Sequence, residues 1–197
     1  MSLFVRTAVV PAFRSLAGFR SYLRRDFRYR CAYCGITEVY RRGADAFGID
    51  HFRPRRLFPA LSFHYPNLYY CCNTCNSYKG GTWPDAGEVA NGFGFADPCE
   101  CDPYADHFRE EPDGSLTAAS PVGRYSIDTL RLNRRELVRF RLRCAGIERS
   151  LERCLALLGD PGLEIHDEDR RLLEAAVSEL RLEWNAILAG VPWGDLG

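Results

Sequence analysis

The chain has 197 residues, of which 46% are hydrophobic and 26% are charged, and its formal net charge is zero. This composition is typical of a globular protein, and the apolar runs are far shorter than the roughly 18 residues that a membrane span requires. Because the first residues also lack the features of a secretion signal, we expect a cytoplasmic protein with no membrane segment.

The zero net charge hides an uneven distribution. Residues 1–80 contain 13 Arg and Lys against four Asp and Glu, whereas residues 81–197 contain 13 against 22. A basic half suits a polyanion such as nucleic acid, although a charge imbalance can also be no more than solvated surface. The nine cysteines, without a secretion signal, favour metal binding or burial over a disulfide framework.

The chain divides into four segments by composition. Residues 1–30 are rich in arginine and aromatic residues and predict a short helix over 13–25, whereas residues 133–197 predict two helices. Between them, residues 31–95 are dense in Cys, Tyr, Pro, Gly and Asn, and residues 96–132 have the turn residues of connecting loops. Within 31–95 we expect short strands at "FGIDHF" and "NLYYC". The predicted fold class is therefore α+β.

The last segment predicts a helical hairpin. Apolar residues recur there at alternating spacings of three and four: Leu137, Phe140, Cys144, Ile147, Leu151, Cys154 and Leu158. "GDPG" at 159–162 ends this helix and Asp167 can cap a second one, so the two should pack antiparallel. Cys144 and Cys154 lie on the apolar stripe and are predicted to be core residues.

Two Cys-x-x-Cys pairs point to a metal. Cys31 and Cys34 form "CAYC", and Cys72 and Cys75 form "CNTC". Each pair can present two thiolates from one turn, and four thiolates are a common ligand set of structural zinc. A redox dithiol is the alternative, but it requires a thioredoxin-like βαβ context, which this sequence lacks. Cys99 and Cys101, with one residue between them, are predicted to be structural.

The segment between the cysteine pairs carries polar residues in a characteristic order. "IDHFRP" contains Asp50 and His51, "PNL" contains Asn67, and Asn76 follows the second pair in "NLYYCCNTCNSYKGG". With "CAYCG" before them and "WP" after them, these motifs resemble HNH endonucleases, the ββα-metal nuclease superfamily, in the form that carries zinc knuckles. The strong part of the resemblance covers residues 31–84.

The resemblance implies a role for each of these residues. His51 would be the general base that activates water, and Asn67 would hold its imidazole in the correct tautomer. Asp50 and Asn76 would bind one catalytic Mg²⁺ or Mn²⁺. Many members of the family have a further histidine ligand four residues beyond the Asn76 position, where this chain has Gly80. Taken singly, Asn67 could begin a turn and Asn76 could cap a helix.

Basic residues near this constellation predict contact with phosphates. Arg53, Arg55 and Arg56 directly follow His51 and are predicted to bind nucleic acid. Lys79 is the only lysine in the chain, and we predict that it contacts the scissile or an adjacent phosphate. A second group of arginines between 131 and 143 either extends this surface or binds an acidic partner.

The sequence therefore predicts a zinc-stabilised HNH endonuclease that cuts DNA with low sequence specificity. Beyond the core, a weaker similarity to nuclease subunits of bacterial anti-phage systems implies a role in antiviral defence beside an ATPase partner. The alternative is a zinc module that binds nucleic acid or a protein partner without catalysis.

Overall fold

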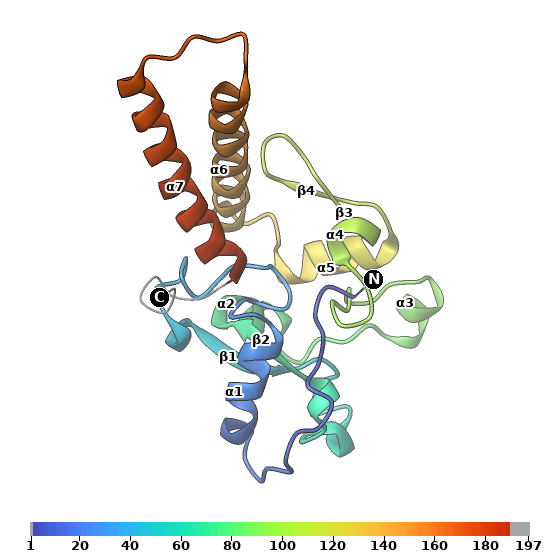
Figure 1. Cartoon of the computed structure of the whole chain (residues 1–197). Helices are drawn as coiled ribbons and strands as arrows, with labels where there is room; N and C mark the ends of the chain where they lie inside the picture. Colours follow the sequence, from blue (N-terminus) through green and yellow to red (C-terminus); the bar gives the residue numbers. More distant parts are fainter. Residues whose placement is uncertain (1, 190–197) are drawn as a thin grey trace.

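The fold is built around a short β-hairpin and the helix that follows it. In the computed structural model, which describes residues 2–189, β1 (Phe47–His51) pairs antiparallel with β2 (Leu68–Cys72). The register places Phe47 opposite Cys72 and His51 opposite Leu68. Helix α2 (Asn73–Lys79) begins directly after β2 and contacts both strands. Both predicted strands are thus confirmed, and together with α2 they form one ββα unit (Figure 1).

All five residues of β2 are buried, which makes this strand the centre of the hydrophobic core. Helix α1 (Leu16–Asp26) packs against β2 and buries Phe19 and Leu23. The helix was predicted to begin at residue 13, but it begins three residues later, at Leu16, and Phe13 folds back onto it. A Cβ atom on Gly18 would lie 2.4 Å from the ring of Phe13, so the glycine permits this close approach.

The loop between β1 and β2 contains two short 3₁₀ helices, η2 (Pro59–Leu61) and η3 (Tyr65–Asn67), and a third, η1 (Ala44–Ala46), precedes β1. Each of η2 and η3 has a proline in its first positions, where the missing N–H costs nothing. The loop is therefore a sequence of defined turns that starts at His51 and ends at Asn67.

The prediction that residues 96–132 are connecting loops is wrong. The structure forms four short elements there, α4 (Pro103–Asp106), β3 (Phe108–Glu110), β4 (Leu116–Ala118) and α5 (Pro121–Leu130), after α3 (Ala86–Ala90) in the segment before them. Local caps start these helices: Asp85 and Glu88 form a capping box, and the Ser120 hydroxyl accepts the Gly123 N–H. The elements of three to five residues are too short to show a hydrophobic period in sequence. The ten-residue α5 was missed because its buried positions include Gly123 and Ser126, which interrupt the apolar stripe.

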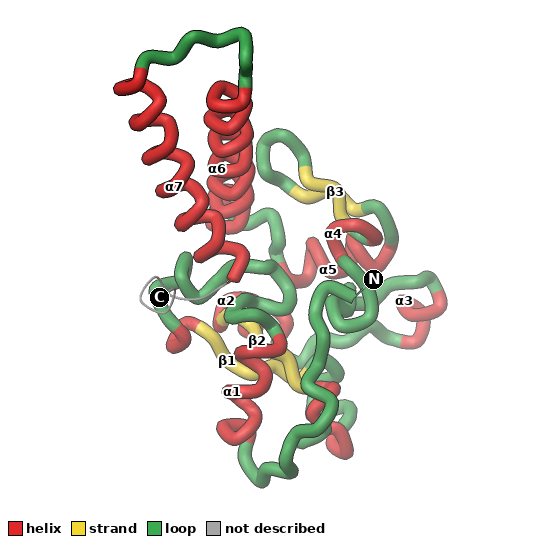
Figure 2. The backbone as a smooth tube through the Cα atoms, in the orientation of Figure 1, coloured by secondary structure: helices red, strands yellow, loops and turns green. Residues whose placement is uncertain are grey.

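The predicted helical hairpin is confirmed as α6 (Arg135–Gly159) and α7 (Asp167–Ala189), and its residues 190–197 lie outside the described part of the chain. Figure 1 and Figure 2 show the two helices projecting away from the ββα unit. At the base of α6 the stripe residues Leu137, Phe140 and Ile147 are buried. Cys144 and Cys154 are both half-buried, and Cys144 packs against the core as predicted. Cys154, nearer the tip, is not part of this core cluster. No helix among residues 2–189 has the length and hydropathy needed to cross a membrane.

Candidate functional site

The four cysteines of the two Cys-x-x-Cys pairs meet in one buried cluster. The Sγ atoms of Cys31, Cys34, Cys72 and Cys75 lie within 4.8 Å of one another. Four sulfurs bound tetrahedrally to zinc at about 2.3 Å would be about 3.8 Å apart, and the Sγ atoms of Cys34 and Cys72 are 3.8 Å apart. The donor set and its dimensions therefore fit a structural zinc ion.

Local backbone structure brings the two pairs together. Cys72 ends β2 and caps α2, and its Sγ accepts the backbone N–H of Cys75. In the other pair, the turn after Cys31 closes through Gly35, whose φ of +69° favours glycine, and the N–H of Ala32 donates to Tyr70 of β2. Without a metal, hydrogen bonds from the other cysteines lower the pKa of Cys72, whereas burial raises the pKa of Cys31.

The remaining cysteines lie outside this cluster, in agreement with the structural role predicted for Cys99 and Cys101. Cys71 is fully buried next to Cys72, and burial raises the pKa of its thiol. Cys99 accepts a hydrogen bond from the Arg6 guanidinium, and the Cys101 thiol donates to the carbonyl of Asp97. Both therefore have contacts that fix local structure.

His51 is at the end of β1, where the chain leaves the sheet, and its side chain is partly exposed. Its Nε2 atom is 2.9 Å from the backbone carbonyl of Ser62 in the loop between the strands. A carbonyl oxygen can only accept a hydrogen bond, so a neutral ring in this position carries its proton on Nε2. Nδ1 then has the free lone pair and can accept a proton.

Asn67 acts on the loop and not on the imidazole. Its Oδ1 accepts the backbone N–H of Arg53, and its Nδ2 donates to the carbonyls of Arg53 and Leu61. The buried amide thus ties the start of the loop to its middle. The predicted contact to His51 is instead made by Ser62, because the loop passes its backbone over the ring.

Lys79 lies inside the protein and pairs with Asp50. Its side chain is 0% exposed, and its Nζ is 2.9 Å from Asp50 Oδ2. The ammonium also donates to the backbone carbonyl of His51, and the Tyr33 hydroxyl donates to Asp50. Burial raises the pKa of Asp50, while Lys79 and Tyr33 oppose this shift. This placement differs from the predicted phosphate contact, because a fully buried ammonium does not reach solvent.

The predicted catalytic metal ligands, Asp50 and Asn76, do not fit a divalent cation in this arrangement. Asn76 lies against the face of β1 that also carries Asp50. A Cβ atom on Gly48 would be 3.4 Å from Asn76 Nδ2, and Gly48 and Asp50 share one face of the strand. However, the ammonium of Lys79 already neutralises the only carboxylate of the pair. The uncharged amide of Asn76 remains, and one amide is a weak ligand set for Mg²⁺ or Mn²⁺.

We expect Lys79→Met to lower the free energy of unfolding by about 3–5 kcal/mol, because it leaves Asp50 buried without a cation. Urea unfolding of the purified variant measures this change. The double variant Asp50→Asn with Lys79→Met is the matched control and should recover part of the loss, since it removes both charges. A Lys79→Met protein as stable as the wild type would contradict the buried ion pair.

The three predicted nucleic-acid-binding arginines, Arg53, Arg55 and Arg56, are exposed. Arg53 lies over the rings of Phe58 and Trp83, which holds it at the surface beside the loop. None of the three forms an ion pair with an acidic residue among residues 2–189. Their charges are therefore available to phosphates.

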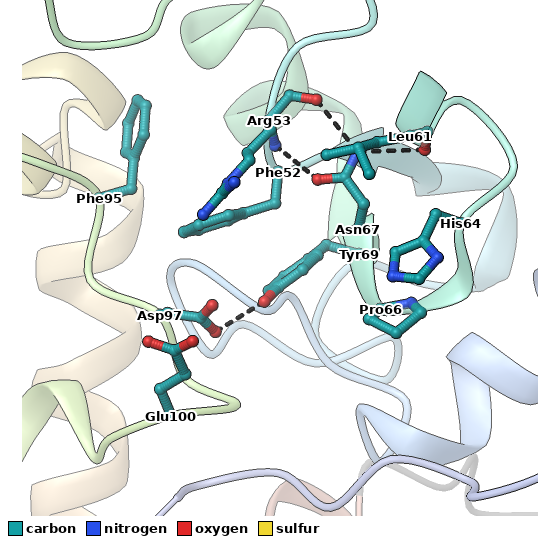
Figure 3. A pocket seen from close by; sticks show the side chains of 10 residues that line it. All are labelled: Phe52, Arg53, Leu61, His64, Pro66, Asn67, Tyr69, Phe95, Asp97 and Glu100. Carbon is teal, nitrogen blue, oxygen red and sulfur yellow. Dashed lines mark hydrogen bonds between the residues drawn. The ribbon is translucent and has the colours of Figure 1, made fainter. Parts of the chain in front are cut away.

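A cavity of about 310 Å³ lies beside this loop (Figure 3). Arg53, His64 and Asn67 line it together with the carboxylates of Asp97 and Glu100, and Asp97 accepts the hydroxyl of Tyr69. Neither His51 nor Asp50 is among its lining residues. The two carboxylates are a poor match for a phosphate backbone, so Arg55 and Arg56, which do not line the cavity, are better candidates for the nucleic-acid contact.

Sequence reasoning missed three contacts at this site. Tyr33 reaches Asp50, Ser62 reaches His51, and Arg134 reaches three sulfurs of the cysteine cluster. Tyr33 lies between the cysteines of the first pair, which places it near the site. For Ser62 and Arg134 the sequence contains no signal, because each contact depends on how distant segments pack.

Comparison with known proteins adds no assignment. No model of a protein family matches the chain, and no curated protein is significantly similar to it. The structure shows an α+β protein, and its four buried cysteines could hold a structural zinc ion.

Proposed function

We propose that this protein is an HNH-type endonuclease that hydrolyses phosphodiester bonds of DNA with low sequence specificity. The observation that supports this function best is the ββα unit. Strand β1 ends at His51, β2 follows the loop, and α2 begins within the second cysteine pair. The motifs that carry the resemblance thus lie on β1, the following loop, β2 and α2 of one compact unit, and this arrangement supports the proposal.

The chemistry proposed for His51 follows from its contacts. With the Nε2 proton held by Ser62, Nδ1 can take a proton from a water molecule that attacks phosphorus. The new bond from this water oxygen to phosphorus replaces the bond to the leaving sugar oxygen, which takes its proton from solvent water. Lys79 and Asn67 act as positioning residues. Lys79 binds the His51 carbonyl, and Asn67 fixes the loop that contains Ser62. Exposed arginines after His51 would hold the phosphate backbone nearby.

The four-cysteine cluster would hold one structural Zn²⁺. Zinc there would join the first cysteine pair to the end of β2 and so fix the ββα unit. Because Asp50 is paired with Lys79, the proposed reaction does not use Asp50 as a ligand of a catalytic cation. A role in antiviral defence beside an ATPase partner stays a prediction from the resemblance.

Cleavage of supercoiled plasmid by the purified protein tests the proposed function. Reactions are run without added metal and with Mg²⁺ or Mn²⁺, beside the variant His51→Ala. Nicking by the wild type and its loss in His51→Ala would support the proposal. Equal nicking by both proteins would overturn the proposed role of His51. Absence of nicking under all conditions would overturn the proposed nuclease activity.

Arg55→Gln combined with Arg56→Gln should weaken DNA binding and reduce its salt dependence. The slope of log K against log salt concentration is negative, and each lost phosphate contact should make it shallower by about 0.9. Fluorescence anisotropy with labelled duplex at several salt concentrations measures both effects. The matched control is Arg170→Gln with Arg171→Gln, two adjacent exposed arginines on α7. Equal slopes for the two double variants would contradict a phosphate contact at Arg55 and Arg56.

A second candidate function is a zinc module that binds nucleic acid without cutting it. The buried pair of Asp50 and Lys79 favours this alternative, because it occupies the carboxylate that a catalytic cation would need. The same assays separate the two functions: DNA binding that depends on Arg55 and Arg56, without cleavage in any metal, would support the second.

A further inference from the structure

Arg134 lies against the cysteine cluster, although about a hundred residues separate it from the first pair. Its Nη2 atom is 3.3 Å from the Sγ of Cys75, 3.7 Å from that of Cys34 and 3.8 Å from that of Cys72. One guanidinium nitrogen thus faces three of the four sulfurs. No other arginine or lysine among residues 2–189 forms a hydrogen bond with this cluster.

The other side of the guanidinium is held by the junction between α5 and α6. Arg134 Nη1 donates to the carbonyls of Leu130 and Arg131, at the end of α5, and Nε is 3.8 Å from the carboxylate of Glu136. Only 12% of the Arg134 side chain is exposed. Since these contacts come from its own helix junction, the guanidinium is positioned independently of the cysteines.

This geometry answers an electrostatic problem of the cluster. Four thiolates around one Zn²⁺ leave two net negative charges, and the four cysteines are buried. Buried charge is costly unless it is paired and hydrogen-bonded. A guanidinium is always protonated and donates from a rigid fork, so it can offset one charge and bind several sulfurs at once.

We propose that Arg134 is the charge partner of the zinc site and that it couples zinc binding to the docking of the helical hairpin. This inference rests on the zinc-binding part of the proposed function and is independent of DNA cleavage. Arg134 stabilises the bound thiolates, and zinc in turn keeps the start of α6 fixed to the ββα unit. Arg134 is a positioning residue, since it acts through the cysteines.

The decisive comparison is between Arg134→Met and Arg135→Met. Arg135 is the next residue, is exposed, and contacts no cysteine, so it is a matched control. Competition with a chromophoric zinc chelator measures the zinc Kd of each purified, zinc-loaded protein. We expect Arg134→Met to bind zinc about 10- to 100-fold more weakly, as for other outer-shell partners, and Arg135→Met to match the wild type within about twofold. Equal Kd values for Arg134→Met and wild type would overturn the proposal.

Two further variants separate charge from a general loss of structure. Arg134→Lys keeps the positive charge, and Arg134→Gln keeps donors without charge. Recovery of at least half of the lost affinity, on a logarithmic scale, by Arg134→Lys but not by Arg134→Gln would support a charge partner. Equal zinc affinity in these two variants would overturn it. If Arg134→Met does not fold, as judged by circular dichroism, this pair alone decides the question. Wild-type protein that binds no zinc would overturn the inference while leaving the cleavage assay unaffected.

Discussion

His51→Ala should slow DNA cleavage by about 100- to 10,000-fold, which is the range that one general base usually contributes. Its ring is partly exposed and makes one hydrogen bond, to Ser62, so we expect the fold to lose only about 1 kcal/mol. Initial nicking rates under single-turnover conditions measure the catalytic effect, and thermal unfolding measures the structural one.

The matched control for this variant is His166→Ala. His166 is exposed and directly precedes α7, whose first turn lies at the end of the hairpin away from the ββα unit (Figure 1). Its variant should cut at the wild-type rate. A slow His51→Ala protein that still binds labelled DNA normally would locate the defect in the chemical step. Normal cleavage by His51→Ala would show that a group other than His51 activates the attacking water.

Cys72→Ala should remove zinc and unfold most of the protein near 25 °C. Structural zinc sites contribute on the order of 10 kcal/mol to folding, which is comparable with the total stability of a typical domain. Cys72 also ends β2 and caps α2, so its loss affects the centre of the core. Zinc content by mass spectrometry of metals, together with circular dichroism, measures both consequences.

Cys71→Ala provides the matched control, because Cys71 is the adjacent residue and is equally buried. Its sulfur is not part of the four-cysteine cluster. This variant should keep one zinc per chain and lose only about 1–2 kcal/mol for the small cavity. If Cys72→Ala kept its zinc and its fold, the cluster would not be a zinc site. A titratable disulfide between Cys72 and Cys75 in the wild type would favour the redox alternative.

Features fixed by neighbouring residues were predictable. The apolar stripe of α6 repeats every three or four residues, and this local period is enough to define a helix and its buried side. The strands that carry His51 and Cys72 were likewise predictable from short β-prone runs with turn residues around them. Helices α3 and α4 were not predictable, because a helix of four or five residues depends on caps and on tertiary contacts. The ten-residue α5 was missed because Gly123 and Ser126 interrupt its apolar stripe.

The predicted site was less complete than the predicted fold. The two cysteine pairs were recognised from spacing, since a Cys-x-x-Cys turn brings two thiols together whatever surrounds it. By contrast, the side chain of Lys79 was expected at the surface and is buried. A lysine in sequence gives no indication of which way its long side chain points, and a buried carboxylate such as Asp50 can hold it inside.

The sequence alone therefore determined which four cysteines could form a metal site, the two strands and the helical hairpin, because spacing and periodicity act over a few residues. Only the tertiary structure decided which groups meet around them. It placed Lys79 on Asp50, Ser62 on His51 and Arg134 on the cysteine cluster. The physical reason is that such contacts join segments separated by 11 to 100 residues, and their distances are set by packing of the whole core.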